Sequence, residues 1–147
     1  MKQVSDHSGL GAALRTTHRL YMRLLQDRLS ETGVSVAQYL HLRVLWEVGG
    51  LTQVEISNRL GIEKASSTST IDALEKQGLI ERFRDDKDRR RVRVFLSASG
   101  KRLCETALRH AAKVADIACD GASDAEVKAV KRWLARAAAN LEVKLQD

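Results

Sequence analysis

The sequence predicts a mainly α-helical fold with one small β-hairpin, and three observations indicate this class. Apolar residues recur at helical spacing through most of the chain. Proline is absent from all 147 residues, which permits long unbroken helices. One stretch, residues 79–96, changes to the two-residue alternation of β-strands around a charged turn. The length and the 44% of hydrophobic residues fit a single domain with its own core, residues 1–147.

Two helices are predicted in the N-terminal third of the chain. The first runs from about Ser8 to Ser30 and ends at Gly33. The second begins at Ser35, with Gln38 at the capping-box position, and ends before residues 49–50, a pair of glycines. The expected inward faces are Leu10, Leu14, Tyr21, Leu25 and Leu29 in the first helix and Ala37, Leu40, Val44, Leu45 and Val48 in the second.

Residues 51–78 predict a pair of short helices. Thr52 and Glu55 have the capping-box spacing, so a helix begins at Thr52, and it ends at Gly61. A second helix runs from Lys64 to about Gln77. The expected inward residues are Ile56 and Leu60 in the first helix and Thr68, Ile71 and Leu74 in the second, with Ser67 beside them. Two capped helices joined at a glycine are typical of the helix-turn-helix, whose second helix lies in the DNA major groove.

The outward face of the second helix of this pair is rich in hydroxyl groups, within the run from Ser66 to Thr70. Such residues are poor helix formers, but their small hydroxyls let a helix approach DNA closely and bond phosphates or base edges. The predicted DNA contacts from this helix are Lys64, Ser66, Ser67, Ser69 and Thr70. The alternative is a frayed Ser/Thr segment that has no partner.

The hairpin that follows carries a cationic tip. In its second strand Val92, Val94 and Leu96 share one face. Seven basic residues lie in this region, namely Arg82, Arg84, Lys87, Arg89, Arg90, Arg91 and Arg93, against the three acids Asp85, Asp86 and Asp88. Cations on a projecting tip suit phosphates and a narrow groove of DNA, and the net charge of +6 favours a polyanionic partner. The alternative is a solvated charged turn.

Two long helices are predicted at the C-terminus. Ser97 caps a helix that runs to about Cys119, Gly121 breaks it, and Ser123 with Glu126 opens a last helix that ends near Leu145. The expected inward faces are Leu103, Ala107, Ala111, Val114 and Ala118, and then Val127, Val130, Trp133, Leu134, Ala137, Leu141 and Leu145. A helix of about 22 residues is roughly 33 Å long, more than a small core needs. We therefore expect residues 8–32 and 101–145 to form a two-fold dimer around the DNA-binding region, residues 35–100. The alternative is a monomeric helical domain.

Residues 52–102 resemble the winged-helix core of the MarR family of bacterial transcription regulators. The resemblance lies in residues 60–62 (LGI), 71–82 (IDALEKQGLIER), 88–90 (DRR) and 96–100 (LSASG). It implies a dimeric regulator that binds a pseudo-palindromic operator, with Arg90 in the minor groove and Asp88 holding the wing turn. Arg84, Arg89 and Arg91 complete the predicted wing contacts. Many members carry arginine where this chain has Ser69 and Ala73, so bidentate guanine recognition from this helix is not expected.

The resemblance also implies a pocket for an aromatic or other anionic effector between the dimerisation helices and the winged helix. A ligand that prefers a spacing of the two recognition helices unsuited to the operator would relieve repression, and activation is the alternative. The candidate ligand contacts are Arg15, His18, Arg19, Tyr39, Arg43 and Trp46. Arginine beside aromatic rings can hold a carboxylate while the ring stacks. The alternative interpretation makes Trp46 a core residue and leaves His18 and His41 as exposed polar positions.

No enzymatic chemistry is indicated, and no cofactor or metal site is expected. The chain has no glycine-rich phosphate loop and no metal-ligand spacing, and Cys104 with His110 is a poor match for a nucleophile and base. Cys104 and Cys119 predict reduced thiols in the cytoplasm, with a redox-sensing regulator as an alternative. We expect no signal peptide and no membrane partner. A non-specific architectural DNA-binding protein and a helical protein-interaction module stay open as other functions.

Overall fold

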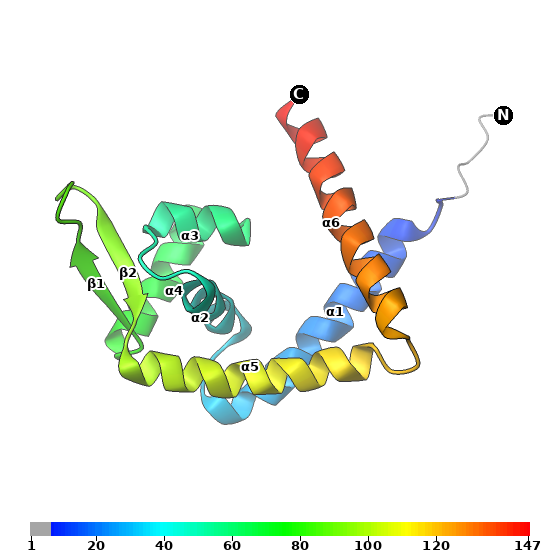
Figure 1. Ribbon diagram of the computed structural model, residues 1–147, viewed down its shortest axis with the longest axis horizontal. Helices are drawn as coiled ribbons and strands as arrows, with labels where there is room; N and C mark the ends of the chain where they lie inside the picture. The colour runs from blue at the N-terminus through cyan, green and yellow to red at the C-terminus, as the bar shows by residue number, and fades with distance from the viewer. Residues whose placement is uncertain (1–6) are drawn as a thin grey trace. The chain divides into compact units, whose positions relative to one another are not determined.

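The computed structural model describes residues 7–147, and it confirms the mainly helical fold with one hairpin (Figure 1). The elements are α1 (Leu10–Leu29), a 3-10 turn (Ser30–Thr32), α2 (Val36–Glu47), α3 (Gln53–Leu60), α4 (Lys64–Lys76), β1 (Ile80–Arg84), β2 (Val92–Leu96), α5 (Ala98–Ala118) and α6 (Asp124–Gln146). The chain forms two compact units that divide within α5, the first ending at Val114 and the second beginning at Ala115.

Capping boxes begin three of the helices, as their spacing predicts. Both halves of a capping box are present at Ser35 with Gln38, at Thr52 with Glu55, and at Ser123 with Glu126. The backbone N–H of Thr52 donates to the Glu55 carboxylate at 2.8 Å, and this bond holds the pKa of Glu55 below its ordinary value. Gly61 ends α3 with a φ of 63°, which is the left-handed region that glycine adopts without steric strain.

The two strands form an antiparallel hairpin with Ile80 opposite Leu96 and Arg84 opposite Val92. Val94 and Leu96 are buried, so the predicted apolar face of β2 is confirmed. Val94 also pairs with Leu51, because its N–H donates to the Leu51 carbonyl at 2.8 Å. The wing is therefore joined by backbone bonds to the segment that precedes α3.

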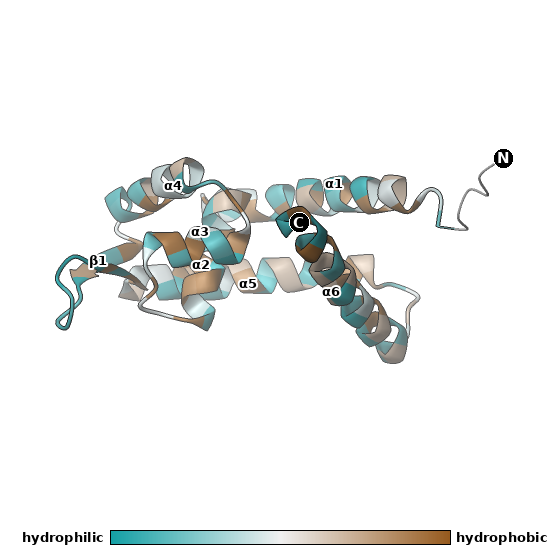
Figure 2. Cartoon of the chain, turned by 90° about the horizontal axis from the view of Figure 1, so that it is seen from above, coloured by the Kyte–Doolittle hydropathy of each residue, from teal (hydrophilic) through white to brown (hydrophobic). Residues whose placement is uncertain are grey.

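The first unit has a main core under the wing and a second cluster beside α1. The main core joins α2, α3, α4 and the hairpin through aliphatic residues that include Leu42, Ile56, Ile71, Leu74 and Val94. The second cluster consists of Leu25, Leu29, Tyr39, Ala107 and Val114. In Figure 2, which colours the ribbon by hydropathy, these helices contain hydrophobic positions in brown and the tip of the wing is hydrophilic, in teal.

The start of α5 is packed directly against the backbone that precedes β1. The Ser97 hydroxyl donates to the Gly78 carbonyl at 2.6 Å and accepts from the N–H of Gly100 at 3.0 Å, so Ser97 caps the helix as predicted. Gly100 is buried, and a Cβ atom there would collide with the Leu79 carbonyl group. Only glycine permits this close approach of helix and strand.

The predicted inward faces are correct for some helices and wrong for parts of others. Leu25, Leu29, Ile56, Ile71, Leu74, Ala107 and Val114 are buried as expected. Leu10, Leu14, Ala37, Val48, Thr68 and Ala118 were expected inward and are exposed. In α2, Leu45 is buried as expected, and the other buried residues are Tyr39, His41 and Leu42. Helix α4 buries Ser67 where Thr68 was expected. The interpretation of His41 as an exposed polar position is wrong.

Helix α6 buries none of its residues within this chain. Its apolar face, which was expected to pack inward, is open: Val130 is 53% exposed, Leu134 40% and Leu141 64%. Exposed apolar surface of this extent marks a site of association in proteins. In the part of the chain that the structure describes, no helix is both long enough and apolar enough to cross a membrane.

Candidate nucleic-acid interface

Helix α4 presents a short polar surface above its packed face. Lys64, Ser66 and Ser69 are exposed, as predicted for the outward face. Thr70 is half-buried, and its hydroxyl donates to the Ser66 carbonyl at 3.1 Å while its lone pairs stay open to an outside donor. Short side chains of this kind let the helix axis approach a nucleic-acid surface closely.

Ser67 does not belong to this outward surface. It is 1% exposed, and its Oγ lies 3.0 Å from Nε2 of His41, which is also 1% exposed. Nδ1 of His41 lies 2.7 Å from the Ala37 carbonyl. A carbonyl only accepts, so Nδ1 carries the proton and Nε2 accepts from the serine hydroxyl. Ser67 is therefore removed from the predicted DNA contacts, since its hydroxyl is used inside the protein.

The wing tip exposes its arginines and is shaped by an aspartate turn. Arg89, Arg90 and Arg91 are exposed, and the side chain of Arg90 is 95% exposed. The Asp88 carboxylate accepts from the backbone N–H of Arg90 at 3.1 Å, and the Asp88 carbonyl accepts from the N–H of Arg91 at 2.9 Å. Asp88 thus lies in the turn where the family resemblance places it. Its weak contact with Arg90 Nε, at 3.4 Å, leaves that guanidinium available.

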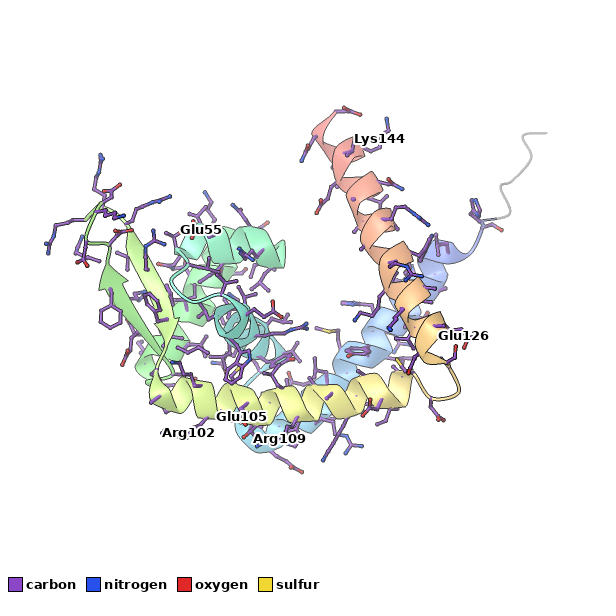
Figure 3. All side chains as sticks on the ribbon, in the orientation of Figure 1. Glu55, Arg102, Glu105, Arg109, Glu126 and Lys144 are labelled. Carbon is purple, nitrogen blue, oxygen red and sulfur yellow. The ribbon has the colours of Figure 1, made fainter. Side chains whose placement is uncertain are left out.

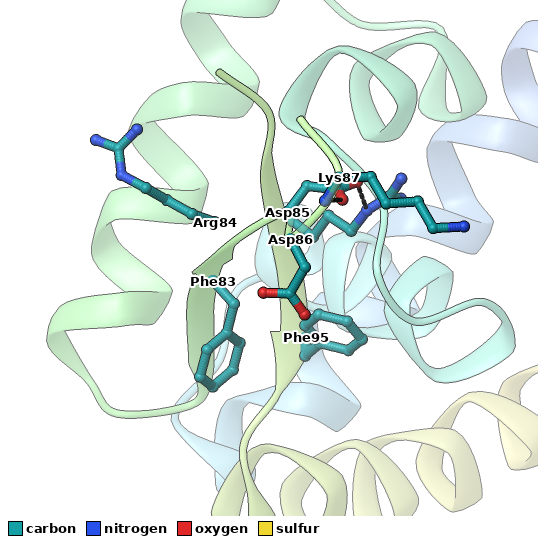
Figure 4. A pocket seen from close by; sticks show the side chains of 7 residues that line it. Phe83, Arg84, Asp85, Asp86, Lys87 and Phe95 are labelled. Atoms are coloured by element: carbon teal, nitrogen blue, oxygen red, sulfur yellow. Dashed lines mark hydrogen bonds and ion pairs between the residues drawn. The ribbon is translucent and has the colours of Figure 1, made fainter. Parts of the chain in front are cut away.

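Ionic and backbone bonds hold the base of the wing. The Arg93 guanidinium contacts the Asp85 carboxylate at 2.7 Å and donates to the Gly50 carbonyl at 2.7 Å (Figure 4). The N–H of Lys87, together with Arg93, holds the pKa of Asp85 below its ordinary value. Arg84 donates to the Arg89 carbonyl at 2.8 Å, so this predicted DNA contact also braces the loop.

Arg82 joins the wing to α4. Its guanidinium reaches the Asp72 carboxylate at 2.7 Å and the Glu75 carboxylate at 2.8 Å, and both acids lie on α4. The Arg82 side chain is only 22% exposed, which strengthens both ion pairs relative to ordinary surface pairs. Arg82 is therefore a structural link, and it fixes the wing relative to α4.

Two phenylalanines on the outer face of the wing were missed by the sequence analysis. Phe83 is 54% exposed and Phe95 37% exposed, and their rings meet edge to face at 5.9 Å. They line a cavity of about 680 Å³ together with Arg84, Asp85, Asp86, Lys87 and Arg93 (Figure 4). The signal for this pair was one aromatic residue among the charged residues on the outer face of each strand, Phe83 in β1 and Phe95 in β2.

Five of the six candidate effector residues lie exposed on α1 and α2. Arg15, His18 and Arg19 are exposed on α1. Trp46 on α2 is 44% exposed, so its interpretation as a core residue is wrong.

The other two effector candidates on α2 lie closer to the core. Tyr39 is buried in the second core cluster. Burial raises the pKa of Tyr39, and the neighbouring Arg43 charge opposes that rise. Arg43 is exposed and pairs with Glu47 at 3.2 Å.

The two cysteines differ in exposure. Cys104 is fully buried, and burial raises the pKa of its thiol to about 11. The thiolate is the reactive form, so redox sensing through Cys104 is disfavoured. Cys119 is half-buried. Among residues 7–147, no group of three or more histidine, cysteine, aspartate or glutamate side chains is arranged to hold a metal ion.

Comparison with known proteins agrees with this geometry. Residues 34–92 match the family model described as "MarR family". The chain is 34% identical over 96 residues to the HTH-type transcriptional regulator TtmR of Methylorubrum extorquens (strain PA1), a match that covers 65% of this chain and 49% of that protein. The chain spans about half the length of the first curated relatives that it matches.

Solved structures share the fold over most of the chain. A MarR transcriptional regulator from Methanosarcina mazei Go1 has a TM-score of 0.82 and 27% identity, with 91% of this chain and 97% of that chain covered. A mutant Escherichia coli MarR in complex with operator DNA has a TM-score of 0.80 and 22% identity over 92% and 99% of the two chains. Bordetella bronchiseptica BpsR, whose DNA binding is regulated by 6-hydroxynicotinic acid, has a TM-score of 0.82 and 23% identity over 92% and 97%.

The relatives and the shared fold are those of transcription regulators, not of enzymes. The matched region contains α2, α3, α4, β1 and the wing turn, and it ends at Val92, the first residue of β2. This chain belongs to the MarR family of winged-helix transcription regulators.

Proposed function

We propose that this protein is a sequence-specific transcription regulator that binds a pseudo-palindromic operator as a homodimer. The observation that carries the proposal is the Arg82 link, which bonds the wing to two carboxylates of α4 at 2.7 and 2.8 Å. It makes the hydroxyl-lined face of α4 and the arginine tip of the wing one rigid element. Such an element can place a helix in the major groove and a guanidinium in the adjacent minor groove.

The interface residues divide into three chemical roles. Lys64, Arg89 and Arg91 are exposed cations, and they neutralise phosphates. Ser66, Ser69 and Thr70 bond base edges or phosphates from α4. Arg90 enters the minor groove, since its side chain is 95% exposed and only weakly held by Asp88.

The homodimer is supported by apolar residues that this chain leaves uncovered. Helix α6 has no buried residue, and Leu10 and Leu14 of α1 are 41% and 40% exposed. A two-fold partner that covers such faces is the commonest arrangement of identical chains. It also sets two copies of α4 about 34–36 Å apart, one turn of DNA. The relative from Escherichia coli was solved with operator DNA, which fits this assignment.

A small anionic effector is proposed as the input. BpsR of Bordetella bronchiseptica is regulated by 6-hydroxynicotinic acid, a ring with a carboxylate. In this chain Arg15, His18 and Arg19 on α1 and Arg43 and Trp46 on α2 are exposed and supply cations and an aromatic ring. Tyr39 is buried and interacts with Arg43. The two α4 helices of a dimer can adopt spacings that do not match the operator. A ligand that binds such a spacing more tightly would lower DNA affinity and relieve repression.

The cytoplasm is the proposed site of action. The DNA-binding function is tested by selecting bound sequences from random duplex DNA. We expect enrichment of one inverted repeat, and Arg90→Ala should bind the selected duplex about tenfold more weakly with unchanged circular dichroism. The matched control is Arg109→Ala on α5, because the Arg109 guanidinium hydrogen-bonds Glu105 and Thr106 of its own helix.

Binding without sequence enrichment would favour a non-specific architectural DNA-binding protein. The short hydroxyl side chains of α4 support this alternative. Such binding would fall steeply with salt for every sequence alike. Failure to bind any duplex at low ionic strength would contradict both functions. For the effector, Arg43→Ala should lose part of the response to an aromatic carboxylate, and a full response would remove Arg43 from the pocket.

A further inference from the structure

The N-terminal half of α4 is held in the protein by one buried residue. Helix α4 buries Ser67, Ile71 and Leu74, and only Ser67 lies in the first turn. The exposed residues that we assign to DNA, Ser66 and Ser69, lie on either side of it in the sequence. The contacts of Ser67 therefore set the position of the part of α4 that meets the bases.

The contact that Ser67 makes is directional. Its hydroxyl bonds Nε2 of His41 on α2 at 3.0 Å, and Nδ1 of His41 is fixed by the Ala37 carbonyl at 2.7 Å. A serine in a helix usually bonds a carbonyl of its own preceding turn. Here the hydroxyl reaches to another helix instead. Hydrogen bonds weaken steeply as their angle departs from linear, whereas the aliphatic contacts of Ile71 and Leu74 have no preferred direction.

We propose that His41 is a positioning residue for base recognition, because its bond to Ser67 fixes the rotation of the N-terminal half of α4 about the helix axis. This inference rests on the proposed DNA-binding function and adds a determinant of specificity that touches no DNA. Rotation of α4 would carry Ser66 and Ser69 away from the base edges, and phosphate contacts from the flexible Lys64 side chain would persist.

One other side-chain contact joins the same part of α4 to its neighbours. Nε2 of Gln53 on α3 donates to the Thr68 hydroxyl at 3.3 Å, and both groups are exposed. Water competes for an exposed bond of this length, so it contributes little to the position of the helix. Gln53→Ala is therefore the matched control, since it removes an inter-helix bond of the same type from the solvent side.

The experiment compares four variants with wild-type protein. Each protein is titrated with the duplex that wild-type protein selects from a random pool and with a scrambled duplex, and urea unfolding is measured in parallel. Ser67→Ala leaves Nε2 of His41 without a donor in the core and lowers stability. The double variant His41→Leu with Ser67→Ala replaces the polar pair by apolar side chains and recovers most of that stability. His41→Gln keeps an acceptor for the Ser67 hydroxyl.

The expected result separates positioning from folding. The ratio of affinities for the two duplexes should fall by about fivefold in Ser67→Ala and in the double variant, which is the factor that one typical hydrogen bond represents. His41→Gln and Gln53→Ala should keep the wild-type ratio. Recovery of the ratio together with stability in the double variant would show a merely structural pair and overturn the inference. A wild-type protein that prefers neither duplex would overturn the proposed function as well.

Discussion

Gly100 offers the sharpest test of the packing between α5 and the wing. In Gly100→Ala the new methyl group would collide with the Leu79 carbonyl, whose carbon would lie 2.9 Å from it. The obstacle is backbone rather than a flexible side chain, so α5 must move away from the start of β1. That movement strains the bonds of Ser97 to Gly78 and Gly100, at 2.6 and 3.0 Å.

The expected loss of stability follows from two opposing effects. Overpacking of this kind costs about 3 kcal/mol at the upper end of its usual range. Alanine favours the helix over glycine by at most about 1 kcal/mol, so the net loss is about 2 kcal/mol in the free energy of unfolding. Urea denaturation followed by circular dichroism measures it.

Gly11→Ala in α1 is the control, because no atom lies within 4 Å of the added methyl group. It should gain about 0.5–1 kcal/mol. If Gly100→Ala were as stable as the Gly11 variant, the close approach of α5 to Leu79 would be wrong.

Three further predictions concern Arg82, His41 and Cys104. Arg82→Met should lose about 1–2 kcal/mol of unfolding free energy, because the two short ion pairs of a half-buried arginine side chain disappear. The control Arg109→Met should lose less than about 0.5 kcal/mol, since the ion pair of Arg109 with Glu105 is long, at 3.4 Å, and exposed (Figure 3). Equal losses of unfolding free energy in the two variants would refute the Arg82 link between the wing and α4. Burial holds the pKa of His41 below its ordinary value of 6.5, so the unfolded chain binds more protons just below that pH. The unfolding midpoint should therefore fall as the pH drops from about 6.5 towards the folded pKa, and an identical pH profile in His41→Gln would contradict this cause. Cys104 should resist a thiol reagent until the protein unfolds, because burial raises its pKa to about 11; rapid labelling of Cys104 in the native protein, read by mass spectrometry, would exclude the buried thiol.

The sequence predicted the elements well because their ends carry local chemical signals. Capping boxes such as that of Thr52 with Glu55 depend on residues three apart, and turns such as Gly61 depend on one residue. The alternation of Val92, Val94 and Leu96 likewise identified the inner face of the wing. Signals of this kind need no knowledge of the tertiary structure.

The inner faces of α2 and α4 could not be predicted in the same way. Helix α2 has apolar residues on most of its sides, so periodicity alone could not choose Leu42 over Val48. The burial of Ser67 depends on His41, a residue 26 positions earlier whose ring supplies the missing acceptor. The role of Arg82 also lies outside local pattern, because a run of basic residues does not show which of them meets Asp72 and Glu75.

The open face of α6 has a consequence for the fate of newly made subunits. In the proposed homodimer, α6 would depend on the partner chain for its order, because no residue of α6 is buried within its own chain. At high dilution α6 should therefore fray and expose its apolar residues. Cellular proteases would then degrade monomers faster than dimers. We therefore expect the dimerisation equilibrium to set the lowest concentration at which this regulator is stable in the cell.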